Sequence, residues 1–175
     1  MIPYTLLEFD EIESTSNFLK ENQTYFPHMT IIKANHQTGG RGQFDRTWES
    51  KPNENILFSV LLKDIKFDDM YKIKGWIVTS LMAFFHQNQL IASFKEPNDL
   101  YINDKKICGI LIETQSTLDQ FIYAVIGVGL NVNQIDFSQP KATSMKHETQ
   151  KTYSLKTLFE QLLSILMKEY QKIYA

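Results

Sequence analysis

The pattern of apolar positions divides the chain into several strands and two long helices. Short apolar or β-branched runs predict strands at residues 4–9, 28–36, 55–62 and 121–133. Residues 91–114 predict a strand, a proline turn, a short strand, a polar turn and a further strand.

Helical spacing is clearest in two segments. Residues 70–90 and 155–173 repeat apolar residues every three or four positions, which indicates amphipathic helices. Hydroxyl residues at 14–16 suit the start of a shorter helix that continues to about residue 23. Because strands outnumber helices and do not alternate strictly with them, the pattern predicts an α+β fold with a mixed or antiparallel sheet.

The periodic pattern disappears between residues 36 and 55, where glycine, proline, asparagine and glutamine dominate. Three of the seven glycines in the chain lie within residues 39–42, and the only two arginines, Arg41 and Arg46, lie in the same loop. A loop this long in a compact domain is usually functional or disordered. The grouping of glycine with arginine favours a function.

The chemistry of this glycine loop, residues 38–48, points to an anion. It lacks the third glycine of a dinucleotide fingerprint, and no Gly-Lys-Ser/Thr follows it, so neither common nucleotide motif is present. Glycine lets backbone N–H groups approach an anion, and arginine grips phosphate or carboxylate with a planar fork. Trp48 follows closely and could stack on a base or close a pocket. A mobile surface loop with incidental arginines is the other interpretation of the loop alone.

Three further glycines, Gly109, Gly127 and Gly129, interrupt apolar strands. Glycine inside a strand indicates a bulge, tight packing or the close approach of a ligand. Polar residues cluster near these glycines, namely Lys95, Asn98, Asp99, Lys105, Lys106, Asn131 and Asn133.

Composition narrows the class of protein. At 175 residues with 43% hydrophobic content, the chain is most simply one globular domain, and its net charge of −2 argues against a nucleic-acid partner. No apolar run approaches a bilayer span, and the acidic N-terminus does not look like a secretory signal. The single cysteine, Cys108, excludes an internal disulfide. We expect a soluble cytoplasmic protein.

Five motifs, in order, resemble the catalytic domain of biotin protein ligases. They are "ESTSNFLK", "QTGGRGQFDRTWES", "KEPND", "KKICGILIE" and "GVGLNVN", and "KATSM" fits the stretch that usually follows. The resemblance extends from about Tyr4 to Tyr170. It implies a mixed sheet with helices packed on one side, related to class II aminoacyl-tRNA synthetases. It also implies that residues 1–175 form one catalytic domain, without an N-terminal DNA-binding domain or a C-terminal β-barrel domain.

The resemblance implies ATP-dependent formation of biotinyl-5′-AMP, followed by transfer of biotin to a lysine of a biotin carboxyl carrier protein. Biotin and ATP would be substrates, with Mg²⁺ accompanying ATP and no metal ligands assigned. The expected partner is the carrier domain, with neither nucleic acid nor membrane. Pairing of two copies through exposed strand edges is left open.

The same resemblance assigns roles to individual residues. Biotin would be bound by Ser14, Thr15, Ser16, Gln37, Arg41, Gly42, Gln43, Lys106 and Gly109. ATP and the adenylate would be bound by Gly40, Arg46, Trp48, Lys95, Asn98, Asp99, Lys106 and Asn131. Lys106, Arg41 and Arg46 would be catalytic, because they stabilise charge that develops at the α-phosphate.

The sequence departs from the family pattern at two positions of the site. Gln43 replaces an arginine of the usual loop, and Glu96 replaces the tryptophan of the Lys-Trp-Pro-Asn-Asp turn. A carboxylate at position 96 would oppose nucleotide binding unless it points outward. Two alternatives accompany the ligase hypothesis. A lipoate ligase or octanoyltransferase of the same superfamily would share the fold, and the departures at positions 43 and 96 would suit a non-catalytic biotin or adenylate binder.

Overall fold

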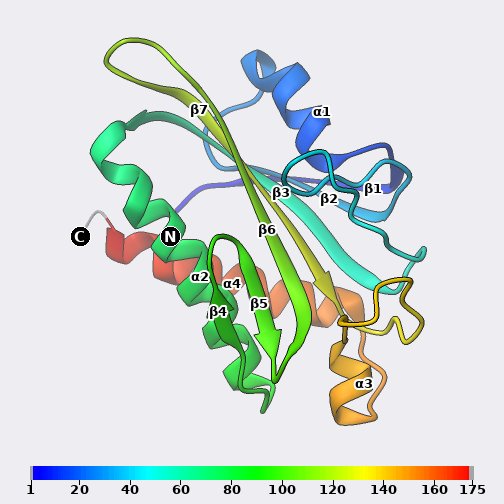
Figure 1. Ribbon diagram of the computed structural model, residues 1–175. Helices are drawn as coiled ribbons and strands as arrows, with labels where there is room; N and C mark the ends of the chain where they lie inside the picture. Colours follow the sequence, from blue (N-terminus) through cyan, green and yellow to red (C-terminus); the bar gives the residue numbers. More distant parts are fainter. Residues whose placement is uncertain (1, 174–175) are drawn as a thin grey trace.

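The computed structural model describes residues 2–173, which form a seven-stranded sheet with helices on both faces (Figure 1). The strands are β1 (Thr5–Ile12), β2 (Thr30–Gln37), β3 (Asn55–Lys66), β4 (Ser93–Lys95), β5 (Asp99–Ile102), β6 (Lys105–Ser116) and β7 (Gln120–Asn131). The helices are α1 (Thr15–Asn22), α2 (Met70–Gln87), α3 (Met145–Thr149) and α4 (Leu155–Ile173), with short 3₁₀ turns η1 (Gln23–Tyr25) and η2 (Phe67–Asp69).

The sheet is mixed, which confirms the predicted α+β class. Its strand order is β1-β2-β3-β7-β6-β5-β4. Strands β1 and β2 are parallel and are joined by α1, whereas every other neighbouring pair is antiparallel. Strand β7, the last in the sequence, therefore lies in the interior of the sheet between β3 and β6.

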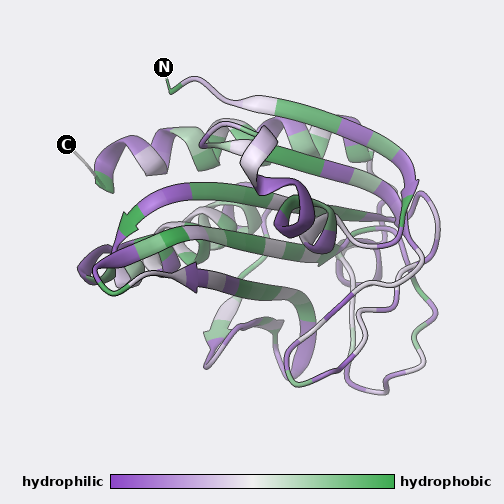
Figure 2. Cartoon of the chain, turned by 90° about the horizontal axis from the view of Figure 1, so that it is seen from above, coloured by the Kyte–Doolittle hydropathy of each residue, from purple (hydrophilic) through white to green (hydrophobic). Residues whose placement is uncertain are grey.

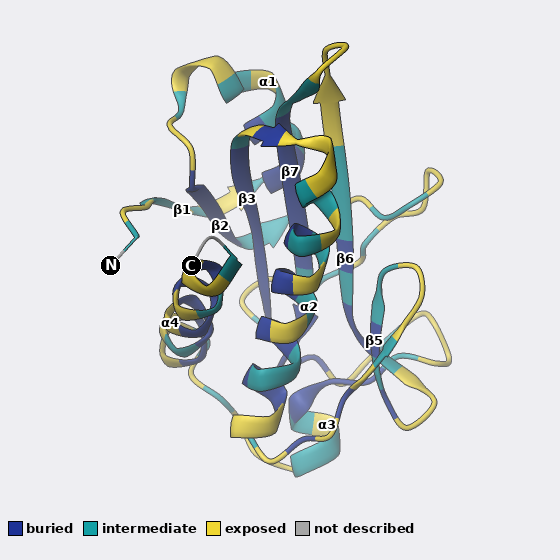
Figure 3. Ribbon diagram, turned by 90° about the vertical axis from the view of Figure 1, so that its left-hand side faces the viewer, coloured by how far each residue is buried: buried dark blue, intermediate teal, exposed yellow. Residues whose placement is uncertain are grey.

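Helices α2 and α4 pack together against one face of the sheet and bury the larger hydrophobic core. Trp76 of α2 donates its indole N–H to the Leu166 carbonyl of α4 at 2.8 Å, while Phe58 of β3 meets Phe159 of α4 edge-on. In Figure 3, β3 and β7 are buried behind α2, whose exposed residues face outward.

The short helix α1 covers the opposite face of the sheet. Its Leu19 joins a second buried cluster with Ile32, Leu61, Tyr123 and Val125. The predicted packing of helices on one side is therefore right for α2 and α4 but incomplete, because α1 lies on the other face. The reason is visible in Figure 2, where the interior strands are apolar along much of their length, so both faces need cover.

Two segments outside the predicted strands and helices contain short regular elements. The glycine loop folds into a small hairpin, and the polar stretch at residues 140–152 includes α3. Both elements are short, and periodicity does not reveal an element of this length. Within residues 2–173, no helix combines the length and the apolar character that a membrane span requires.

Candidate functional site

A pocket opens on the α1 face of the sheet, between the glycine loop, the start of α1 and the C-terminal end of β7. The structure brings most of the predicted residues to its lining, namely Ser14, Thr15, Ser16, Gln37, Arg41, Gly42, Gln43, Arg46, Trp48, Asn98, Asp99, Lys106, Gly109 and Asn131. Residues from five separate segments of the sequence thus meet in one place.

Two predicted residues do not line this pocket. Gly40 lies behind it, where its carbonyl accepts a hydrogen bond from the Trp48 N–H at 2.9 Å. Lys95 lies at the exposed end of β4, with its ammonium group 4.8 Å from the centre of the Tyr101 ring. The structure therefore gives Gly40 a place in the framework and does not bring Lys95 to the predicted adenylate site.

The glycine loop is a tight hairpin that carries both arginines. Arg41 pairs with Thr47, and the Gly42 N–H donates to the Arg46 carbonyl at 2.7 Å. Phe44 and Asp45 form the tip, with φ of 53° and 59°. Positive φ at both central residues is the geometry of a two-residue hairpin turn. The hairpin holds Arg41 and Arg46 on the two sides of this tip.

Hydroxyl and amide groups form an uncharged wall at one end of the pocket. Ser14 caps α1, its hydroxyl accepting from the Asn17 N–H at 3.3 Å. The Gln37 side-chain oxygen accepts from the Thr15 N–H at 2.8 Å and from the Thr15 hydroxyl at 3.0 Å. Since these oxygens are engaged before any ligand arrives, the wall is ordered in advance.

The direction of the hydroxyl hydrogen bonds in this wall follows from proton counting. The Thr15 hydroxyl donates its one hydrogen to Gln37. In the contact of 2.7 Å between the Thr15 and Ser59 hydroxyls, Ser59 must therefore be the donor. Ser16 must then donate to Ser59 across 2.8 Å. Ser16 is left with acceptor capacity only. Ser59 of β3, which the sequence interpretation missed, sets this polarity.

Glycines form the floor of the pocket. Gly109 of β6 and Gly129 of β7 lie opposite each other, and the Trp48 indole rests on both. A Cβ atom at Gly129 would lie 2.3 Å from Trp48 Cε2, and one at Gly127 would lie 2.5 Å from the Ser16 hydroxyl. The strand glycines are thus explained by close packing of side chains onto the sheet.

Lys106 stands over this floor. Its ammonium group is 2.7 Å from an Asp99 carboxylate oxygen and 5.4 Å from the centre of the Trp48 ring. Backbone hydrogen bonds tie Lys106 to the "KATSM" segment, since its N–H donates to the Lys141 carbonyl and its carbonyl accepts from the Thr143 N–H. Asn131 donates to the Thr143 carbonyl at 3.0 Å. That segment therefore positions two of the predicted residues.

The two unusual residues flanking the site are both turned away from it. Glu96 is mostly exposed and pairs with Lys74 of α2 at 2.7 Å, so its carboxylate does not line the pocket. Cys108 is fully buried, and this burial raises the pKa of its thiol, an effect that Lys106 opposes and Asp99 reinforces. Position 96 therefore adds no negative charge to the pocket lining, and the thiol stays protonated.

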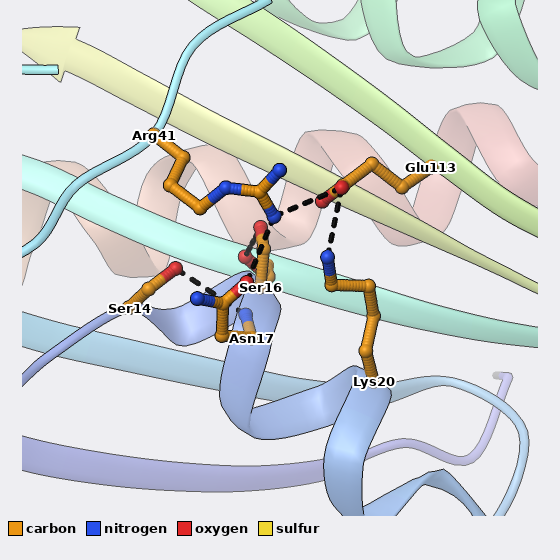
Figure 4. A network of polar contacts seen from close by, with 7 residues as sticks. Ser14, Ser16, Asn17, Lys20, Arg41 and Glu113 are labelled. Atoms are coloured by element: carbon orange, nitrogen blue, oxygen red, sulfur yellow. Dashed lines mark hydrogen bonds and ion pairs between the residues drawn. The ribbon is translucent and has the colours of Figure 1, made fainter. Parts of the chain in front are cut away.

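Arg41 makes an ion pair that the sequence interpretation did not anticipate. Its Nη1 atom donates to Asn17 at 2.8 Å and to Glu113 at 2.9 Å, and Lys20 of α1 also contacts Glu113 at 2.8 Å (Figure 4). Glu113 lies in β6 with the same alternation as Gly109 and Leu111, so it projects from the same face of the sheet. This alternation in the sequence could have indicated that Glu113 lies on the same face as the pocket.

The fold is an α+β domain, and its pocket has an uncharged polar end and an end that carries Arg41, Arg46 and Lys106. The sequence model of the Biotin/lipoate A/B protein ligase family matches residues 7–131. The chain belongs to this family.

Individual relatives agree with this assignment. The chain is 32% identical over 124 residues to the Bifunctional ligase/repressor BirA of Bacillus subtilis, an alignment covering 70% of this chain and 38% of that protein. It is 32% identical over 124 residues to the Biotin--[acetyl-CoA-carboxylase] ligase of Mycobacterium tuberculosis, covering 66% of this chain and 44% of that protein. The aligned region thus spans less than half the length of either relative.

Among solved structures, biotin protein ligase from Aquifex aeolicus in complex with biotin and ATP superposes with a TM-score of 0.83. That match has 27% sequence identity and covers 96% of this chain and 71% of the other. The similarity therefore extends over nearly the whole described fold.

Proposed function

We propose that this chain is an ATP-dependent biotin protein ligase. It would join biotin to ATP as biotinyl-5′-AMP with release of pyrophosphate, and then transfer biotin to a lysine of a biotin carboxyl carrier protein. The observation that carries the proposal is the union, in one pocket, of an uncharged hydroxyl and amide wall with Arg41, Arg46 and Lys106. The Aquifex relative was solved with biotin and ATP, which supports the same substrates here.

The uncharged wall suits the ureido ring of biotin. That ring offers two N–H donors and one carbonyl acceptor, all without charge. Ser16 can accept from an N–H because its own hydrogen is directed to Ser59. Buried neutral partners of this kind discriminate well, because a ligand without the matching groups leaves them unsatisfied.

The cationic end suits the reacting groups. The biotin carboxylate would attack the α-phosphate of ATP, forming the mixed anhydride as pyrophosphate departs, so no nucleophilic side chain is required. Arg46 forms no ion pair with any residue from 2 to 173, and Lys106 could exchange Asp99 for a phosphate oxygen. Catalysis would then rest on alignment of the substrates and on stabilisation of charge at phosphorus.

Trp48 and Asp99 complete the proposed adenylate site. Trp48 would stack against adenine, and its indole N–H is buried without a hydrogen-bond partner in residues 2–173. Within that range no three His, Cys, Asp or Glu residues are grouped as metal ligands. Since proteins commonly hold Mg²⁺ through one carboxylate and substrate phosphates, Asp99 fits an ion that arrives with ATP.

The second step needs no further catalytic group at the anhydride. The neutral amine of the carrier lysine would attack the biotinyl carbonyl, AMP would leave with the electron pair of the broken bond, and the proton released from the amide nitrogen would pass to water. The exposed hairpin tip at Phe44 lies beside the pocket residues Gln43 and Arg46, where an incoming carrier would have to pass.

Biotin-dependent exchange of labelled pyrophosphate into ATP tests the proposal directly. We expect exchange by the unmodified protein and a fall of about 10²–10³-fold in Lys106→Met, because one preorganised cation is lost. Lys105→Met is the matched control, since this neighbouring lysine is exposed and does not line the pocket. Absence of exchange by well-folded protein would refute the ligase proposal, and exchange driven by lipoate instead of biotin would favour the lipoate ligase alternative.

A further inference from the structure

We propose that Glu113 is a positioning residue that fixes the Arg41 guanidinium so that one edge of it faces the ligand. This inference rests on the proposed function, because it concerns how the same pocket grips the carboxylate of biotin and, later, the phosphate of the adenylate. Glu113 does not line the pocket itself, so it would act only through Arg41.

The division of hydrogen bonds on Arg41 is the first observation. The two hydrogens of Nη1 are used, one by the Asn17 side-chain oxygen at 2.8 Å and one by Glu113 at 2.9 Å. Neither Nε nor Nη2 has a hydrogen-bond partner within residues 2–173. Nε–H and the adjacent Nη2–H form the side-on fork that binds a carboxylate or phosphate with two parallel hydrogen bonds. Anchoring Nη1 therefore leaves that fork free.

The second observation is the charge of the group. Glu113 contacts two cations, Lys20 at 2.8 Å and Arg41 at 2.9 Å, so the three side chains together carry one net positive charge. If Glu113 paired with Arg41 alone, its carboxylate would cancel the charge intended for the anion. The charge of Lys20 offsets that of the Glu113 carboxylate. Arg41 can therefore be held by Glu113 and still attract the anionic group of the ligand.

The third observation is an unsatisfied atom. The second carboxylate oxygen of Glu113 is buried without a hydrogen-bond partner in the described chain. Leaving a buried acceptor unpaired is unfavourable, and such exceptions concentrate at functional sites.

The contacts of Glu113 also join three separate elements of the site. Arg41 belongs to the hairpin, Asn17 and Lys20 belong to α1, and Glu113 belongs to the middle of β6 (Figure 4). These contacts therefore tie the hairpin to the helix that begins at the uncharged wall of the pocket. Both ends of biotin would be gripped in a fixed relation.

The test compares biotin with biotinol, its uncharged alcohol analogue, by calorimetry on the whole chain. For Glu113→Gln we expect biotin to bind about tenfold more weakly, with biotinol affinity unchanged, because only the charged ligand uses the Arg41 fork. In an Arg41→Ala background, Glu113→Gln should have no further effect on biotin binding, as a double-mutant cycle requires for a residue acting through its partner. Glu8→Gln, which removes an exposed glutamate paired with Lys33, is the matched control.

Each other outcome overturns the inference. Equal losses for biotin and biotinol would mean that Glu113 merely supports α1. Tighter binding of biotin by Glu113→Gln would mean that the carboxylate competes with the ligand for Arg41. Failure of the unmodified protein to bind either compound would instead count against the proposed function, so the two failures are distinguishable.

Discussion

At the scale of single residues, the packing of Trp48 on the glycine floor ties the sheet to the proposed adenine site. The indole rests on Gly109 and Gly129, and its distance from a hypothetical Cβ at Gly129 is only 2.3 Å. A ring in that position cannot remain if a methyl group is added beneath it. The backbone of β7 thus determines how closely the Trp48 ring can approach the sheet.

Gly129→Ala should therefore displace Trp48 and weaken binding of biotinyl-5′-AMP by about tenfold or more, which corresponds to about 1.4 kcal/mol. Gly75→Ala provides the contrast, because Gly75 lies within α2 with nothing within 4 Å of the added Cβ. That substitution should stabilise the fold by about 0.5–1 kcal/mol and leave ligand affinity unchanged. Unaltered adenylate affinity in Gly129→Ala, measured by calorimetry, would contradict the proposed role of Trp48.

Cys108 offers a second prediction at this scale. Burial holds the pKa of its thiol far above the ordinary range, so almost no thiolate forms near neutral pH. The native protein should fail to react with a thiol reagent such as dithionitrobenzoate up to pH 9, and should react fully once unfolded in guanidinium. Rapid labelling of folded protein would show instead that β6 opens near Lys106.

At the scale of elements, the hairpin of the glycine loop is strained at its tip. Phe44 and Asp45 both adopt the left-handed conformation, and the exposed Phe44 side chain gains little packing in return. Each such L-residue costs roughly 1–2 kcal/mol, less for aspartate, whereas Asn-Gly adopts this turn readily. The strain favours opening of the loop that carries Arg41 and Arg46.

Replacing the tip by Phe44→Asn with Asp45→Gly should keep the hairpin closed for longer. The amide protons of Gly42 and Trp48 report closure, because they donate to the Arg46 and Gly40 carbonyls. Their exchange with solvent should slow by about tenfold, and release of the adenylate should slow with it, since about 1.4 kcal/mol of strain is removed. Unchanged exchange rates would mean that the turn is not what limits opening.

At the scale of the whole molecule, the periodic pattern of apolar residues was enough to predict the main helices and strands. Helices α2 and α4 and strands β3 and β7 were predicted within a few residues, because each buries a long apolar face with a regular repeat. Helix α3 and the glycine hairpin were not predicted, because both are short and are held by side-chain and loop contacts that leave no periodic pattern in the sequence. The expectation that all helices pack on one side came from the family resemblance, and α1 is too short for its own pattern to show which face of the sheet it covers.

The residues of the site likewise fall into those that the sequence could predict and those that it could not. Arg41, Trp48 and Lys106 could be singled out because residue type and local motif carry their chemistry. Ser59 and Glu113 could not, because they look like ordinary members of β3 and β6 until the fold brings α1 and the hairpin beside them. Lys95 was included for its motif, yet it lies outside the pocket.

The position of β7 in the sheet determines how early the pocket can form while the chain is being synthesised. Strands β1 to β3 and strands β4 to β6 share no edge and are joined only through β7, which comes after both groups in the sequence. On a ribosome, neither group can complete the sheet until residues 120–131 have emerged, and the floor at Gly127 and Gly129 arrives with them. The proposed ligand pocket therefore cannot be complete before β7 has joined the sheet, and under the proposed function retention of biotin would report that the entire sheet has closed.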